Sequence, residues 1–223
     1  TLHSIKSKFM ENKPYTKEVL RCQPRWQTLY FYQKSQVLYQ LTFDFARRYL
    51  KRGDRTIDQM VQAARSGKQN IVEGSADGVT SMELEIKLIN VARASIKEVR
   101  EDYEDYLISR KLTIWEADHP RYARLISFCR SRNRLEDYQP FFSRWNDEEL
   151  ANVALSLCHF IDKMMTSYEK YLQKIFIEEG GIKERMTAAR LGYRSNQKEE
   201  IERLKQALES ANQQLQELRE VIK

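Results

Sequence analysis

The feature that most constrains the fold is a helix-forming segment, residues 55–74, in which small side chains are concentrated. Its apolar residues recur at the 3.6-residue period of an α-helix, as at Met60, Ala64 and Ile71. The small side chains along it are those of Ala63, Ala64, Ser66 and Gly67. Because they leave little between two backbones, the segment predicts a central helix packed closely against others.

Start and stop signals flank this helix. Gly53 and Asp54 interrupt the chain before it, and Gly74 is placed to end it as a left-handed C-cap. Thr80 and Glu83 have the spacing of a capping box, which predicts the start of a second helix. The two helices and their short loop are therefore predicted to form an antiparallel hairpin.

A family resemblance rests on two runs, QMVQAARSGKQNIVEGS at residues 59–75 and ARASIKE at residues 92–98. They resemble the signature of the bacterial four-helix-bundle proteins related to ribosomal RNA intervening-sequence proteins, a family that includes the accessory variability protein of diversity-generating retroelements. The likeness is greatest to its four helix bundle suffix domain branch, and spans residues 26–112 plus a last helix. It implies a small non-enzymatic bundle that forms homopentameric barrels and, in the retroelement branch, binds nucleic acid and a reverse transcriptase.

The composition favours the same fold class. Hydrophobic residues make up 41% of the chain and charged residues 31%, with only 7 Gly and 4 Pro, which favours long helices. We predict an all-α protein with an antiparallel up-and-down four-helix bundle over residues 26–180. A basic arm, residues 1–25, precedes the bundle, and a helical coiled-coil extension, residues 181–223, follows it. A basic helical insertion, residues 111–145, separates the third helix from the fourth and is predicted to include a loop around Asn133 and Pro140.

The cysteines and the apolar runs indicate in which cellular compartment the protein is expected. Cys22, Cys129 and Cys158 are odd in number and lack C-x-x-C spacing, which predicts neither a disulfide framework nor a zinc site. The longest apolar run, residues 153–161, is too short to span a bilayer, and the chain begins without a signal-peptide pattern. We therefore predict a cytoplasmic protein with no membrane partner.

The first predicted helix, residues 26–51, is apolar on two sides. One stripe comprises Tyr30, Val37, Leu41 and Phe45; the other comprises Leu29, Tyr32, Tyr39, Phe43, Ala46 and Leu50. The third predicted helix, residues 81–110, likewise carries Leu84, Leu88 and Val91 off its main seam. Because a lone bundle helix buries one stripe, the second stripes predict another contact, most economically between subunits. The alternative is that the arm or the tail of the same chain covers them.

The fourth predicted helix begins at a capping box of Asn146 and Glu149 and stops at Gly180 and Gly181. Its seam has heptad spacing and comprises Leu150, Ala154, Leu157, Ile161, Met164, Tyr168, Tyr171 and Ile175. A short helical piece follows and is predicted to end at Gly192.

The last segment has the spacing of a coiled coil. Its seam comprises Ile201, Leu204, Leu208, Ala211, Leu215, Leu218 and Ile222. A stripe so short and narrow needs a partner. The partner is predicted to be the copies in neighbouring subunits, with the chain's own bundle and another protein as alternatives.

The net charge of +6 permits a polyanionic partner. Residues 110–134 hold seven Lys or Arg against two acids, and Tyr122, Phe128 and Tyr138 are interleaved among them. Such a mixture suits phosphate contacts and base stacking, although an insertion that only supports the end of the bundle would also be charged. The candidate nucleic-acid contacts are Arg47, Arg48, Lys51, Arg52, Arg55, Arg121, Arg124, Arg130, Arg132 and Arg134.

Within the family-like motif, four polar residues, Arg65, Asn70, Glu73 and Arg93, are predicted to form a structural network, because buried charges must be paired. Glu73 and Arg93 are the predicted partners across the hairpin. No catalytic constellation is present in the sequence: the single Glu-x-x-His, Glu116 to His119, falls in a predicted loop. We predict no metal site, no cofactor and no enzyme activity.

The leading functional prediction is a homo-oligomer, a pentamer by resemblance, that binds RNA or DNA as an accessory to a reverse transcriptase or another nucleic-acid enzyme. The alternative is a scaffold protein whose ring and coiled coil dock a protein partner without binding nucleic acid.

Overall fold

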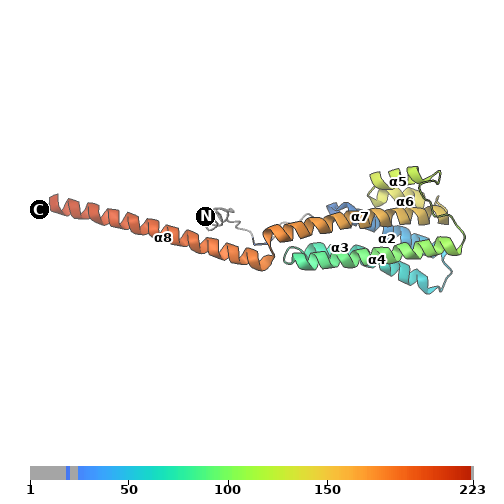
Figure 1. Cartoon of the computed structure of the whole chain (residues 1–223), viewed down its shortest axis with the longest axis horizontal. Coiled ribbons are helices and arrows are strands. Elements are labelled where there is room, and N and C mark those ends of the chain that lie inside the picture. The colour runs from blue at the N-terminus through green and yellow to red at the C-terminus, as the bar shows by residue number, and fades with distance from the viewer. Residues whose placement is uncertain (1–18, 21–24, 222–223) are drawn as a thin grey trace, which may run out of the picture. The chain divides into compact units, whose positions relative to one another are not determined.

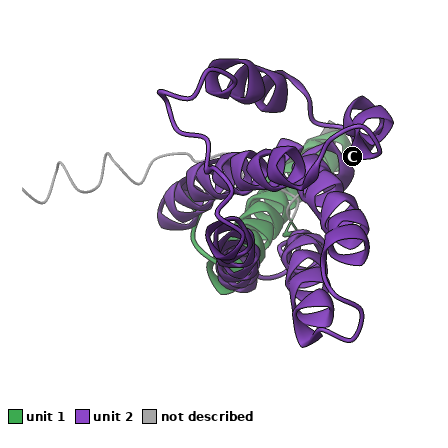
Figure 2. Ribbon diagram, turned by 90° about the vertical axis from the view of Figure 1, so that its right-hand side faces the viewer, with its two compact units in different colours: residues 1–20, 179–223 green, residues 21–178 purple. Residues whose placement is uncertain are grey.

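The computed structural model describes residues 19–20 and 25–221 and shows an all-α protein. The chain divides into two compact units, one of residues 21–178 and one of residues 1–20 and 179–223 (Figure 2). Most of the predicted basic arm lies outside the described residues. No helix in the described part of the chain has the length and hydrophobicity needed to cross a membrane.

The larger unit is built on long helices that run alternately in opposite directions (Figure 1). They are α2 (Tyr30–Tyr49), α3 (Arg55–Asp77), α4 (Met82–Ser109) and α7 (Asp147–Glu179). A 3-10 turn, η1 (Trp26–Thr28), precedes α2, and α5 (Tyr122–Ser131) and α6 (Leu135–Phe142) lie between α4 and α7. The apolar faces share one core, in which Phe45, Tyr103 and Ile161 are fully buried.

Two glycines of α3 lie against α4. A Cβ atom at Gly67 would come within 2.7 Å of Cδ1 of Ile96, and one at Gly74 would lie 3.2 Å from Cβ of Leu88. Side chains larger than hydrogen would push the helices apart at these points. The prediction that small residues permit close packing of this helix is confirmed.

The predicted end of this helix at Gly74 is wrong. The helix continues to Asp77, and Gly78 after it is right-handed, with φ of −60°. Gly74 is needed for contact with α4 rather than for a left-handed turn. The predicted start is confirmed, since the Asp54 side chain accepts a hydrogen bond from the Thr56 N–H at 2.9 Å.

The start of α4 differs from the predicted capping box by one residue. The Oγ of Ser81 accepts a hydrogen bond from the Leu84 N–H at 3.2 Å. The hydroxyl of Thr80 instead donates to the carbonyl of Asp77 at 3.0 Å, at the end of the preceding helix. The longer α3 thus takes Thr80 into its own terminal turn.

The segment around Pro140 is helical, contrary to the predicted loop. Pro140 lies within α6, where proline removes a backbone hydrogen bond. Tyr138 of the same helix is fully buried, and its ring meets that of Phe128 edge to face at 5.0 Å. This tertiary packing offsets the local cost of the proline.

The capping box of α7 is confirmed. The Glu149 N–H donates to Oδ1 of Asn146 at 2.8 Å, and the Asn146 N–H donates to Oε2 of Glu149 at 3.0 Å. The helix ends at Glu179, and Gly180 follows with a φ of 74°, as its predicted stop requires.

The predicted seam of α7 is wrong in its last turns. Met165 and Leu172 are fully buried, whereas Tyr171 is 54% exposed. A helix with 3.6 residues per turn drifts away from a strict seven-residue repeat, so the buried face moves off the predicted positions.

Arg93 links α4 to α7. Its Nε donates to Oδ1 of Asp162 at 2.9 Å and its Nη1 to Oε2 of Glu169 at 2.8 Å. Arg93 therefore pairs with two carboxylates of α7 and not with Glu73, which is exposed on α3, so the predicted pairing of Glu73 with Arg93 is wrong.

The other motif residues do not join Arg93 in one network. Asn70 donates to the carbonyl of Ser66, one turn earlier in its own helix, at 2.9 Å. Arg65 is exposed on α3. Small neighbours such as Ser66 allow Asn70 to be satisfied locally, without a charged partner.

The second apolar stripe of α2 is only partly covered. Ala46 is fully buried, but Phe43 is 36% exposed. On α4, Leu84 and Val91 are 38% and 41% exposed. Apolar surface therefore remains on the single chain along both predicted second stripes.

The smaller unit contains one continuous helix, α8 (Ile182–Val221). The predicted break at Gly192 is wrong, because one glycine inside a long helix costs only about 1 kcal/mol. Seam residues Leu204 and Leu208 are 61% and 62% exposed. Ile222, the last predicted seam position, lies outside the described residues. The stripe is therefore available to a partner.

Candidate nucleic-acid interface

One end of the larger unit gathers the predicted basic residues. Figure 1 shows that α2 and α4 end there, that α3 and α7 begin there, and that α5 and α6 lie beside them. Nη2 of Arg110 donates to the carbonyl of Tyr49 at 3.0 Å, and the Tyr49 hydroxyl donates to the carbonyl of Trp145 at 3.2 Å. We refer to residues 47–55 and 110–149 as the basic end.

All ten predicted contact residues are exposed, and they fall into two groups. Three are held by carboxylates: Arg48 by Asp44 at 2.9 Å, Arg121 by Glu149 at 2.6 Å and Arg132 by Asp137 at 3.3 Å. The other seven form no ion pair with another described residue, and are Arg47, Lys51, Arg52, Arg55, Arg124, Arg130 and Arg134. These seven are free to meet an anion.

Lys34 of α2 fixes the end of α5. Its ammonium is buried and donates to the carbonyl oxygens of Cys129 and Arg132. These carbonyls lie at the C-terminus of α5, where the helix dipole favours a cation. Burial lowers the pKa of Lys34, although the nearby Asp137 carboxylate opposes that shift.

Asn152 of α7 fixes the chain that leads into α5. Its Oδ1 accepts from the Trp115 N–H at 2.7 Å, and its Nδ2 donates to the carbonyl of Thr113 at 2.9 Å. Nε1 of Trp115 donates to Oε1 of Glu148 at 2.8 Å. The irregular segment before α5 is therefore held in a defined position by α7.

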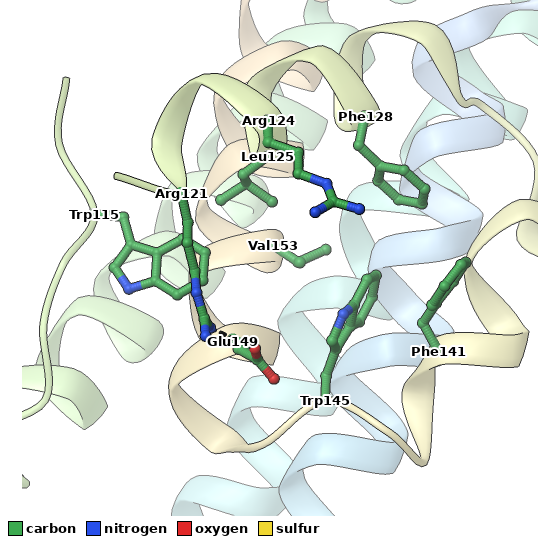
Figure 3. Close-up of a pocket in the computed structure, with 9 residues that line it drawn as sticks. All are labelled: Trp115, Arg121, Arg124, Leu125, Phe128, Phe141, Trp145, Glu149 and Val153. Carbon is green, nitrogen blue, oxygen red and sulfur yellow. Dashed lines mark hydrogen bonds and ion pairs between the residues drawn. The ribbon is translucent and has the colours of Figure 1, made fainter. Parts of the chain in front are cut away.

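These anchors form a pocket of about 440 Å³, whose walls come from four separate parts of the chain (Figure 3). Its lining residues are Trp115, Arg121, Arg124, Leu125, Phe128, Phe141, Trp145, Glu149 and Val153. Trp145 and Phe141 are stacked, with ring centroids 5.2 Å apart and planes at 16°. Phe128 meets Trp145 nearly at a right angle, 88°, at 6.0 Å.

The charges around this pocket do not cancel. Arg121 forms an ion pair with Glu149 and lies over the ring of Trp115, 5.6 Å from its centroid. Arg124 forms no ion pair among the described residues, and Figure 3 shows its guanidinium directed into the pocket. Two cations and one carboxylate leave a net charge of +1, which suits an anionic ligand.

The sequence predicted only one aromatic residue of this pocket, Phe128. The predicted stacking role of Tyr138 is wrong, because its ring is fully buried. Phe128 does line the pocket, but Trp115, Phe141 and Trp145 were not among the predicted residues. The available signal was that two of the three tryptophans, Trp115 and Trp145, lie near the two ends of the insertion.

The thiols of the described cysteines are unreactive. Cys129 and Cys158 are free and buried. Burial raises the pKa of Cys129 from 9.0 to about 12, and burial also raises the pKa of Cys158. Neither thiol is ionised near neutral pH, so neither is prepared to act as a nucleophile.

Comparisons with known proteins return no match: no family model, no curated protein and no solved structure is significantly similar to this chain. The family resemblance of residues 59–75 and 92–98 stays a prediction.

Proposed function

We propose that this protein is a non-enzymatic nucleic-acid-binding protein that contacts RNA or DNA through its basic end. The observation that carries this proposal is a set of seven exposed cations that form no ion pair with another described residue and that lie, with an aromatic pocket, in the basic end. Unpaired Lys and Arg side chains can exchange condensed counterions for phosphates, and aromatic rings can stack on bases.

The assembly belongs to the same proposal. The long helices of the larger unit are taken as an up-and-down four-helix bundle, and its exposed second stripes as contacts between subunits. The pentameric number, and the role as an accessory to a reverse transcriptase or another nucleic-acid enzyme, rest on the family resemblance. The buried free thiols fit a reducing cytoplasm, which we propose as the location.

The proposal predicts a steep dependence of affinity on salt. With the seven unpaired cations as phosphate contacts, binding of a fluorescent oligonucleotide should weaken about 1,000-fold or more between about 50 and 200 mM salt. Reversing Arg130 and Arg134 to Glu should lower the affinity at least about tenfold and reduce the logarithmic salt slope by about two. Fluorescence anisotropy measures both. Arg132 is left intact because it pairs with Asp137.

A matched control separates local contacts from overall charge. Reversing Lys87 and Lys97, which are exposed on α4, changes the net charge of +6 to +2, as the Arg130 and Arg134 pair does. This control should retain most of the affinity. Equal losses in the two double variants would mean that no defined basic end exists, and binding to no nucleic acid at low salt would remove the proposal.

The second candidate function is a scaffold whose α8 docks a protein. The exposed seam of α8 favours it, since apolar side chains at Leu204, Leu208 and Leu215 are more than half exposed. In this function the charge reversal at Arg130 and Arg134 leaves activity unchanged, whereas disruption of the seam abolishes it.

The seam is tested by substituting Leu208 with Asp. If α8 associates with α8 of other subunits, the mass measured by light scattering should fall to that of a smaller assembly, because a carboxylate in a coiled-coil seam is costly. Gln206→Asp adds the same charge outside the seam and should keep the full mass. If both variants keep the wild-type mass, α8 does not join the subunits.

A further inference from the structure

The pocket at the basic end is more elaborate than phosphate contacts require. Phosphates are neutralised by exposed Lys and Arg alone, whereas here the walls are aromatic and apolar. Val153 and Leu125 form buried parts of the lining, at 2% and 8% exposure. Binding of a flat apolar group to such a surface is favourable, because it removes apolar area from water.

We propose that this pocket receives one unstacked nucleobase of a single-stranded nucleic acid and that Arg124 binds the phosphate attached to it. The inference rests on the proposed function and names the part of the nucleic acid that this site reads. Phosphate contacts alone attract duplexes and single strands alike. A pocket for an unstacked base would add a preference for single strands.

The aromatic rings leave a space in which a nucleobase can stack. Figure 3 shows Trp115 and Arg121 on one side of the pocket, Trp145 on the other, and Val153 between them. Phe141 stacks against Trp145 at 5.2 Å and so supports the ring from behind. A base can then lie along Trp145, a contact that is insensitive to sequence because every base has an aromatic face.

The positions of the walls are set before any ligand binds. Trp115 is held through its backbone by Asn152 and through its indole by Glu148. Arg121 is held by Glu149, whose other oxygen accepts from the Asn146 N–H at the start of α7. A site that is ordered in advance loses less entropy when it binds.

The charges select an anionic aromatic group over a neutral or cationic one. Glu149 is already neutralised by Arg121, so the charge that remains is that of Arg124. Its guanidinium can form two parallel hydrogen bonds to a phosphate. A cavity of about 440 Å³ falls within the range of small-ligand sites, about 300–1,000 Å³, and accommodates one nucleotide.

The experiment compares two single strands that carry the same phosphates, one of oligothymidine and one of equal length in which every nucleotide is abasic. Fluorescence anisotropy gives both affinities, and tryptophan emission reports stacking. The intact strand should bind about tenfold or more tightly than the abasic strand and quench the emission. Trp145→Leu should reduce this difference by removing the stacking face. Arg124→Ala should also reduce it, because Arg124 is proposed to bind the phosphate attached to the base in the pocket, a contact that the abasic strand does not form.

The matched control is Arg130→Ala, which is on the same helix α5 and also exposed, but outside the pocket lining. It should weaken both strands alike and leave their ratio unchanged. Because Arg124 is exposed and without an ion pair among the described residues, Arg124→Ala tests the pocket even if Trp145→Leu loosens the fold, which circular dichroism checks.

The outcomes separate the two proposals. Equal binding of the intact and abasic strands overturns the base pocket and leaves phosphate binding standing, while binding of neither strand overturns both. Thymidine monophosphate alone is the third probe, because a free nucleotide has the same chemistry. If it binds with the same dependence on Arg124 while the two strands bind alike, the ligand is a free nucleotide and the assignment to a strand is wrong.

Discussion

Raising the pH above about 9 is expected to destabilise the larger unit steeply and to unfold it near pH 11. Four thiols and phenols that are at most 1% exposed are buried in its core: Cys129, Cys158, Tyr103 and Tyr138. Burial raises the pKa of Cys129 from 9.0 to about 12 and raises the pKa of each of the other three. In the unfolded chain these groups regain their ordinary pKa values.

The direction follows from proton counting. The folded state keeps its four protons, whereas the unfolded chain releases those of the thiols above about pH 9 and those of the phenols above about pH 10. Lys34 offsets at most one of these protons, because burial lowers its pKa below that of an unfolded lysine, about 10.4. The unfolded state therefore binds fewer protons in total, so the free energy of unfolding falls as pH rises. Each group contributes about 1.4 kcal/mol per pH unit, which makes about 5 kcal/mol per unit once all four titrate.

Urea denaturation followed by circular dichroism at several pH values measures this slope. Cys158→Ala should reduce it by about one proton, at the cost of a small cavity. Tyr103→Phe should reduce it similarly and also lose the hydrogen bond to Thr42, which is 3.1 Å long. A slope of less than one proton in the wild-type protein would contradict the burial of these groups in solution.

Substituting Lys34 with Met is expected to lower the free energy of unfolding by about 2–4 kcal/mol. Methionine fills similar space but leaves the carbonyls of Cys129 and Arg132 without their buried donor. The Arg132 carbonyl retains the Tyr138 hydroxyl at 3.0 Å, which limits the damage at that oxygen. Urea denaturation near neutral pH measures the loss.

Lys87→Met, at an exposed position on α4, is the control and should change the stability by less than about 0.5 kcal/mol. Hydrogen exchange should show the loss at Lys34 first in α5, because this lysine joins α5 to α2. If Lys34→Met and Lys87→Met had the same stability, the ammonium of Lys34 would be solvated in solution and would not be bound to the carbonyls of α5.

Periodicity was sufficient to predict the long helices of the larger unit. The apolar residues of α3 and α4 recur at helical spacing, and each helix buries that face. Helix ends were harder, because a local signal can be overruled by packing. Gly74 has the chemistry of a C-cap, yet its missing side chain is used against Leu88. Pro140 likewise predicts a loop, but burial of Tyr138 keeps it in a helix.

The candidate site was predicted in its charges and in one of its aromatic residues, Phe128. Exposed arginines are visible in composition, since a local surplus needs no knowledge of the fold. The pocket depends on contacts between distant residues, such as Trp115 with Asn152, which are 37 positions apart. Lys34 illustrates the same limit: lysines are mostly exposed in folded proteins, yet this one is buried against an oxygen 95 positions away. Sequence spacing alone does not specify such pairs.

Because α8 is helical without a break at Gly192, it can act as a rigid spacer of defined length. The 40 helical residues of α8 extend about 60 Å. A flexible linker of the same number of residues has ends only about 35 Å apart on average, and that distance fluctuates widely. Groups attached at its two ends are thus kept at a fixed spacing and at a fixed rotation about its axis. Changes in the length of α8 that preserve its heptads would alter the spacing alone, while other changes would also turn one end relative to the other.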